Sequence, residues 1–314
     1  MIPRGIISIL QTAFTPAGEL DLKSQARLTE DAVDAGADAL ICTGVAGEVT
    51  YLSLEERILL LRTTMSAAAG RIPLIAGVSD RDAGLVRTLI GWAESNRLAA
   101  CMLAVPQDLY QTPSQIVPYF REVLEGVSLP VMLQDFQIDG KGMGAGILSE
   151  LAAQLPVIKG IKIETMPAGP KYTAVKRTLG KDFHVSGGWA VSQFIEAMDR
   201  GVDAMIPESS MVRVYKRLFT VYEQGGREEA VSLFRSLLPV LSFTNQEVGN
   251  SIKFFKLLLV RKGIFSSSVM RYPEPEWDKI SYAIAEELIE LYLEIEERCG
   301  AAGGSLTERR PAGQ

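Results

Sequence analysis

The sequence contains only one histidine, His184, and only three cysteines, Cys42, Cys101 and Cys299. The cysteines lack the spacing of metal ligands or of a redox pair. Two of them lie inside apolar, strand-like runs, where we interpret them as buried small apolar residues. No apolar run reaches the ~18 residues that a membrane span requires, and the N-terminus lacks the arrangement of a secretory signal peptide. These absences predict a reduced, cytoplasmic protein that does not enter the membrane.

An excess of basic charge is also missing. The chain has 32 Lys and Arg residues against 38 Asp and Glu residues, which gives a net charge of −6, and no basic block interrupts it. We therefore expect binding neither to nucleic acid nor to anionic lipid. Its 47% apolar and 22% charged residues are typical of a globular protein with a sizeable core. A length of 314 residues suits one large α/β domain or two ordinary ones.

Short apolar runs alternate with longer amphipathic stretches over the first two thirds of the chain. The expected strands are Ile6–Leu10, Ala39–Thr43, Leu74–Val78, Ala100–Val105, Val131–Asp135, Val157–Ile163, Phe183–Ser186 and Ala204–Ile206. Most are apolar on both faces, as in parallel strands covered by helices. Eight such units favour a (β/α)8 TIM barrel over residues 1–210; a doubly wound sheet is the alternative.

Helical patterns follow most of the expected strands. Examples are Ser24–Ala35, Ser53–Ala68 and Pro113–Leu124, and Ser53-Leu54-Glu55-Glu56 has the pattern of a capping box. Residues 211–299 contain no further strand pattern. They contain helical patterns at Val212–Gln224, Arg227–Leu241 with Ser251–Lys262, and Glu276–Glu297, which we expect to form a C-terminal helical appendage. The tail, 300–314, is rich in Gly, Ala and Arg, and its composition predicts disorder.

The sixth expected strand carries two lysines in an otherwise apolar segment. Reactive residues of a barrel come from the C-terminal ends of its strands and the loops that follow. Lys159 lies near the start of the strand, where its charge can reach solvent at the base, and Lys162 lies near the end. If Lys162 points inward, desolvation disfavours its ammonium form and leaves a fraction of neutral amine that can attack a carbonyl. The alternative is a lysine that extends outward between helices.

Two further features are weaker. Gly44-Val45-Ala46-Gly47-Glu48 follows the second strand, and its glycines would let backbone amides approach a carboxylate closely; a purely structural loop is the alternative. His184 lies at the beginning of the seventh strand, away from the expected active face, so we assign it a structural role. The methionines within the strands, Met102, Met132 and Met205, are interpreted as core filler.

Several short motifs share their order and spacing with a known family. They are Leu10-Gln11-Thr12-Ala13-Phe14, Gly18-Glu19-Leu20-Asp21, Gly44–Glu48 with Leu52–Arg57, Pro106–Gln115, Gly160-Ile161-Lys162, Ser186-Gly187 and Arg271-Tyr272-Pro273. Together they resemble the dihydrodipicolinate synthase / N-acetylneuraminate lyase family of class I aldolase-like lyases. Gly160-Ile161-Lys162 is similar to the family's G-[IV]-K, so the resemblance implies that Lys162 forms the Schiff base. It also implies a homotetramer, or a homodimer of similar build, in which Tyr110 reaches a neighbouring subunit's site.

The sequence departs from this family where proton transfer is expected. Val45 and Ala46 replace two hydroxyl residues that, in the family, bind the pyruvate carboxylate and relay protons. Gln134 replaces the acid/base tyrosine of the fifth strand, and a neutral amide does not titrate near pH 7. The arginine expected shortly afterwards is absent, and Lys141 is the nearest cation. The usual relay of a synthase that condenses pyruvate with aspartate semialdehyde is therefore incomplete.

Two glutamates could take over the proton transfer. Glu164 lies two residues beyond Lys162 with the same parity, and Glu208 ends the eighth strand in Ile206-Pro207-Glu208. Either carboxylate near a neutral lysine could remove and return protons; the alternative for each is a rim residue paired with a Lys or Arg. The residues expected to bind the substrate are Gly44, Val45, Ala46, Gly47, Gly187, Ile206 and Glu208.

The sequence thus predicts a Schiff-base lyase or aldolase that acts on a small 2-oxo acid or similar carbonyl compound. The reaction could be a cleavage, a condensation or a dehydration. No metal or organic cofactor is expected, because the protonated imine itself serves as the electron sink. The rival interpretation is a family member that has kept the lysine but lost turnover and serves as a ligand-binding or regulatory protein. The loss of both hydroxyls and the tyrosine favours the rival; Lys162 in its apolar strand, together with Glu164, favours the enzyme.

Overall fold

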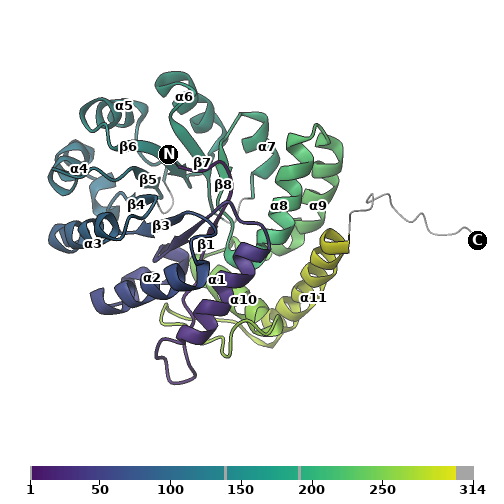
Figure 1. The fold of residues 1–314 in the computed structure, drawn as a ribbon. Helices are drawn as coiled ribbons and strands as arrows, with labels where there is room; N and C mark the ends of the chain where they lie inside the picture. Colours follow the sequence, from purple (N-terminus) through teal and green to yellow (C-terminus); the bar gives the residue numbers. More distant parts are fainter. Residues whose placement is uncertain (1, 138–139, 190–191, 302–314) are drawn as a thin grey trace, which may run out of the picture.

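The computed structural model describes residues 2–137, 140–189 and 192–301. Its eight strands are all parallel and close into a barrel in chain order, with β1 paired to β8 (Figure 1). The strands are β1 (Gly5–Ile9), β2 (Ala39–Cys42), β3 (Leu74–Gly77), β4 (Ala100–Ala104), β5 (Val131–Asp135), β6 (Ile158–Ile163), β7 (His184–Gly187) and β8 (Ala204–Met205). The predicted barrel is confirmed, and the doubly wound alternative is excluded because such a sheet has open edges.

Helices follow the strands and surround the barrel (Figure 1). They are α1 (Leu22–Asp34), α2 (Leu54–Ala68), α3 (Ala83–Ser95), α4 (Ile116–Val123), α5 (Ala145–Gln154), α6 (Gly169–Leu179), α7 (Phe194–Asp199) and α8 (Val212–Glu223). The capping box that opens α2 is confirmed: the Ser53 hydroxyl accepts from the Glu56 amide at 3.2 Å, and the Glu56 carboxylate accepts from the Ser53 amide at 3.0 Å. The stretch predicted as one helix at Pro113–Leu124 is a 3-10 turn, Pro113–Gln115, followed by α4.

The strands are apolar on both faces because each face is buried in a different core. Alternate residues such as Ile7, Ile41 and Met132 pack together inside the barrel. The residues between them, such as Ile6 and Leu40, pack outward against the helices. This two-sided burial explains why the strands were visible as short continuous apolar runs.

Three helices complete the chain: α9 (Arg227–Thr244), α10 (Val248–Arg261) and α11 (Lys279–Ala301). α11 packs against α8 and α9, and α10 contacts the short 3-10 helix Val45–Gly47 that follows β2. None of the helices in the described part of the chain is long and apolar enough to cross a membrane. The boundary expected near residue 210 stays a prediction, and most of the tail expected to be disordered lies outside the described residues.

The structure also places the residues that the sequence analysis assigned to structural roles. Cys42, Cys101 and the strand methionines belong to the core. Lys159 is exposed, as expected at the base of β6. His184 begins β7 and is 7% exposed. Burial lowers the pKa of His184 to about 4, although the nearby Asp203 carboxylate opposes this shift.

Candidate active site

The β-strand register brings Lys162 and Gln134 side by side inside the barrel. Gln134 on β5 pairs in register with Lys162 on β6, one residue before β5 ends. Ile161 and Ile163, on either side of Lys162, belong to the outer core. Because side chains alternate along a strand, Lys162 faces inward, which the sequence could state only as a condition. The lysine therefore does not extend outward between helices.

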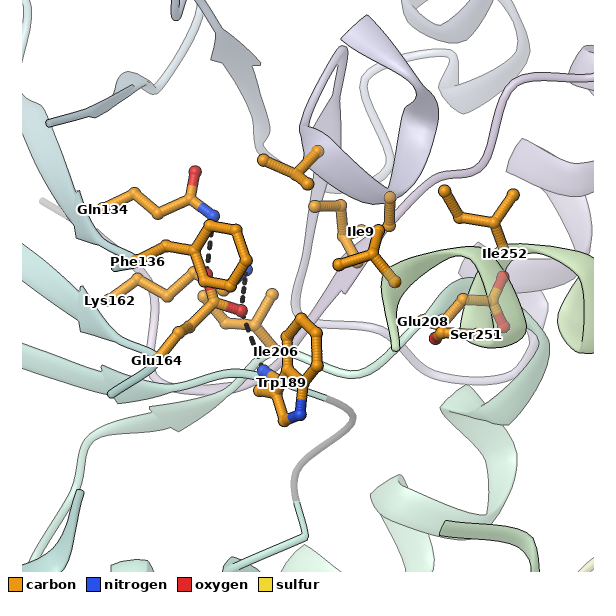
Figure 2. A pocket seen from close by; sticks show the side chains of 13 residues that line it. Ile9, Gln134, Phe136, Lys162, Glu164, Trp189, Ile206, Glu208, Ser251 and Ile252 are labelled. Carbon is orange, nitrogen blue, oxygen red and sulfur yellow. Dashed lines mark hydrogen bonds and ion pairs between the residues drawn. The ribbon is translucent and has the colours of Figure 1, made fainter. Parts of the chain in front are cut away.

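The Lys162 amine is paired with the carboxylate of Glu164. Its Nζ lies 2.9 Å from Glu164 Oε1, and the two side chains are 4% and 6% exposed. Glu164 Oε2 accepts a hydrogen bond from Gln134 Nε2 at 2.6 Å, and Oε1 accepts one from the Trp189 amide at 2.8 Å (Figure 2). The sequence led us to expect desolvation alone to set the state of the amine. The structure adds a carboxylate at ion-pair distance, which is an acceptor for a proton from the amine.

The turn after β7 brings backbone up to this pair. A Cβ atom on Gly188 would lie 2.4 Å from both Glu164 Oε1 and Lys162 Cε, so any larger residue there would displace these two side chains. Trp189 follows with a φ of 58° and directs its amide at Glu164. The consecutive glycines Gly187 and Gly188 at a strand end were the signal that could have predicted this close approach.

A cavity opens beside Lys162 (Figure 2). It is lined by Ile9, Val45, Ala46, Gln134, Phe136, Lys162, Glu164, Trp189, Ile206, Glu208, Val248, Ser251 and Ile252. Seven of these residues were expected from the sequence. Six were not: Ile9, Phe136, Trp189 and the three residues of α10. Nothing in the local sequence indicates that α10 reaches the mouth of the barrel.

Four residues expected at the site do not line this cavity. Three of them are glycines that allow close packing instead. A Cβ atom on Gly44 would lie 2.5 Å from Ile9, and one on Gly47 would lie 2.9 Å from the Leu10 carbonyl oxygen. A Cβ atom on Gly187 would lie 2.8 Å from both Met205 and the Tyr172 hydroxyl. The Tyr110 hydroxyl donates to the buried Asp135 carboxylate of its own chain at 2.9 Å, and Lys171 also pairs with that carboxylate. The role of Tyr110 across a subunit boundary, and the homotetramer or homodimer that it presupposes, stay predictions.

Glu48 of the glycine loop is structural. Its carboxylate is buried, forms an ion pair with Lys256 of α10, and accepts from the Arg271 and Tyr272 amides at 2.6 and 2.7 Å. The glycine loop and the Arg271-Tyr272-Pro273 motif, more than 200 residues apart, are therefore in contact. This contact holds the loop that carries Val45 and Ala46 against the C-terminal part of the chain.

Glu208 lines the cavity from another side. It is 5% exposed; its Oε1 accepts from the Ser209 hydroxyl at 2.7 Å and its Oε2 from the Ser210 amide at 2.8 Å. Burial raises the pKa of Glu208 above its ordinary value, while hydrogen bonds from Ser210 and Ser209 act against that shift. Among the described residues, no Lys or Arg lies close enough to form an ion pair with it. It is therefore not the paired rim residue that the alternative reading expected.

A second, wider cavity adjoins the first. The two share Phe136, Glu164, Trp189 and Val248, and the rings of Phe136 and Trp189 stack with centroids 5.5 Å apart. Its remaining lining residues are Gln137, Gly140, Met166, Asn245, Gln246, Glu247 and Tyr272. Within the described chain, Lys162 is the only Lys or Arg that lines either cavity, so Lys141 does not take the place of the missing arginine. In the same part of the chain, no group of three His, Cys, Asp or Glu side chains could hold a metal ion.

Comparison with known proteins identifies the family. The model of the dihydrodipicolinate synthetase family matches residues 2–290. The chain belongs to this family. The resemblance drawn from its motifs is thereby confirmed, and the synthases and the dehydratase among its curated relatives support a lyase.

Two curated relatives within the dihydrodipicolinate synthetase family differ in activity. L-2-keto-3-deoxyarabonate dehydratase of Azospirillum brasilense is 28% identical over 87% of this chain and 89% of its own length. 4-Hydroxy-tetrahydrodipicolinate synthase of Xanthomonas axonopodis pv. citri is 31% identical over 83% of this chain and 85% of its own.

Solved structures share the fold. Dihydrodipicolinate synthase from Rhodopseudomonas palustris superposes with a TM-score of 0.83 at 23% identity, covering 92% of this chain and 97% of that one. The sialic acid aldolase of Ruminococcus gnavus gives 0.82 at 19% identity, covering 94% and 98%. These similarities support the barrel fold and do not identify the substrate.

Proposed function

We propose that this protein is a lyase in which Lys162 forms an imine with the carbonyl carbon of a 2-oxo acid. The observation that carries the proposal is the Lys162 amine 2.9 Å from the Glu164 carboxylate in the wall of a cavity. Glu164 takes a proton from the ammonium, and the neutral amine then attacks the carbonyl to form a carbinolamine. Glu164 returns that proton to the carbinolamine hydroxyl, which leaves as water. The protonated imine then withdraws electrons from the neighbouring carbon, and the Glu164 carboxylate removes a proton there.

Gln134 acts as a positioning residue in this scheme. Its side-chain amide donates to Glu164 Oε2, which fixes the carboxylate beside the amine. Its own Oε1 is buried and has no hydrogen-bond partner within the described chain, so it can accept from a substrate hydroxyl or from the imine N–H. The acid/base task that the family gives to a tyrosine at this place thus passes to Glu164, which can titrate.

For the substrate we propose a 3-deoxy-2-oxo sugar acid that undergoes dehydration. The inner cavity is walled by Ile9, Ile206 and Ile252, and the outer cavity offers amides and hydroxyls to a longer chain. Because no Lys or Arg of the described chain other than Lys162 lines either cavity, the far end of the substrate is uncharged. The dehydratase activity named for the Azospirillum brasilense relative agrees with this class.

Borohydride trapping followed by mass spectrometry tests the proposal. The panel is pyruvate, a longer apolar 2-oxo acid and L-2-keto-3-deoxyarabonate, each with and without reduction. We expect adducts with the two extended acids at least as readily as with pyruvate, together with release of water from the sugar acid. Lys162→Ala should form no adduct, while Lys159→Ala, a lysine exposed on the same strand, should trap like the parent.

The outcomes separate the alternatives. Full trapping in Lys162→Ala contradicts the assignment of the nucleophile. An adduct with pyruvate alone contradicts the extended substrate. Adducts without turnover of any acid would favour the ligand-binding or regulatory protein, for which the missing hydroxyls of Val45 and Ala46 are the supporting observation.

A further inference from the structure

Two carboxylates face the same cavity from different elements. Glu164 follows β6, and Glu208 follows β8; both line the space above Lys162. Figure 2 shows Glu208 beside Ser251 and Ile252, across the pocket from the Lys162–Glu164 pair. A ligand joined to Lys162 and extending across the cavity would therefore have one carboxyl group near its attached end and another farther along its chain.

The two carboxyl groups differ in whether a cation lies beside them. Glu164 lies 2.9 Å from the Lys162 amine and accepts two further N–H hydrogen bonds. Glu208 is buried without an ion-pair partner among the described residues, and its carboxylate accepts hydrogen bonds from the Ser209 hydroxyl and from the hydroxyl and amide of Ser210. The Lys262 charge acts on Glu208, but Lys262 is itself paired with Glu296 at 2.8 Å and Asp31 at 3.7 Å. Burial raises the pKa of Glu208, in the direction that retains a proton.

Of two carboxyl groups that line one site, the one paired with a cation suits a base, and the buried one without an ion-pair partner suits an acid. We infer that Glu208 is a second catalytic residue, the general acid that protonates the leaving hydroxyl of the substrate, while Glu164 is the base. This inference rests on the proposed function. It assigns removal of the carbon-bound proton to Glu164 and protonation of the leaving hydroxyl to Glu208.

The step balances without any co-reactant. Glu164 removes a proton from the carbon next to the imine, and the C–H electron pair forms the enamine double bond. The enamine then expels the hydroxyl from the following carbon as Glu208 transfers its proton to it, so that one water leaves and a conjugated imine remains. Return of the proton from Glu164 to Glu208 through solvent restores both groups.

Three measurements on Glu164→Gln and Glu208→Gln test this division. All variants should still give the pyruvate adduct at the end point of borohydride trapping, because Lys162 is intact, but Glu164→Gln should reach it more slowly because its amide cannot take the amine's proton. Exchange of pyruvate methyl hydrogens in D2O reports the base: we expect Glu164→Gln to lose exchange and Glu208→Gln to keep it. Release of water from L-2-keto-3-deoxyarabonate should fall about 10²–10⁴-fold in both variants. Glu223→Gln, an exposed glutamate at the end of α8, is the matched control and should change none of the three.

An analogue in which fluorine replaces the leaving hydroxyl distinguishes an acid from a structural residue. Fluoride leaves without a proton, so Glu208→Gln should eliminate fluoride at nearly the parent rate, whereas Glu164→Gln should not. Unchanged water release in Glu208→Gln, loss of its methyl exchange, or no rescue by the fluoro analogue would overturn the assignment of Glu208 alone. No adduct and no exchange in the parent would instead overturn the proposed function, and the inference with it.

Discussion

The side chains around Lys162 differ from the proton relay that the family resemblance implies, and their contacts suit the relay proposed through Glu164. Three hydroxyl-bearing positions of the family are Val45, Ala46 and Gln134 in this chain. In their place Glu164 lies 2.9 Å from the amine, held by an amide side chain and a backbone N–H. A carboxylate with three partners is fixed in one orientation, which is the condition for efficient proton transfer to a bound ligand.

At the residue scale, His184 provides a measurement of stability that is independent of activity. Burial lowers its pKa to about 4, against about 6.5 in an unfolded chain. A lowered pKa means that the unfolded chain binds the extra proton first as pH falls. As the pH falls from 6.5 to 4, the free energy of unfolding therefore decreases by up to about 3 kcal/mol. Because the chain has no other histidine, His184→Asn should flatten the parent's stability profile in this window, as followed by urea unfolding at each pH. Parallel profiles for parent and variant would contradict the burial argument.

At the scale of elements, the turn that follows β7 positions the pair more than it supports the barrel. A Cβ on Gly188 would meet Glu164 Oε1 and Lys162 Cε, which are near the ends of flexible side chains and can move aside. We therefore expect Gly188→Ala to fold and to unfold at nearly the parent temperature. A displacement of about 1 Å in a reacting group can cost about 10²-fold in rate, so borohydride trapping should slow by about that factor. Gly146→Ala on α5, where a Cβ meets nothing within 4 Å, is the control. Trapping at the parent rate in Gly188→Ala would show that the pair tolerates the displacement.

At the scale of the whole molecule, family membership does not fix the reaction, because the cavity departs from the pattern of the synthases. We expect little condensation of pyruvate with aspartate semialdehyde. Two hydroxyls and a tyrosine are replaced, and losing a general acid/base typically costs about 10²–10⁴-fold in rate. The described residues that line the cavities also offer no Arg to the semialdehyde carboxylate. An assay of dihydrodipicolinate formation with purified protein checks this, with the parent's water release from L-2-keto-3-deoxyarabonate as the internal reference. Synthase activity at ordinary turnover rates would prove the expectation wrong.

The sequence by itself determined the barrel, its strand positions to within about a residue, and the lysine at the end of β6. These features are local: two-sided burial leaves continuous apolar runs, and one lysine in such a run is conspicuous. It could not decide which way Lys162 points, that Gly188 brings the Trp189 amide to Glu164, or that α10 closes the cavity. Those contacts join segments far apart in the chain, so no periodicity or motif records them. Only tertiary structure could place Glu208 across the same space from Glu164, because closing a barrel sets side chains from separate strands around one mouth.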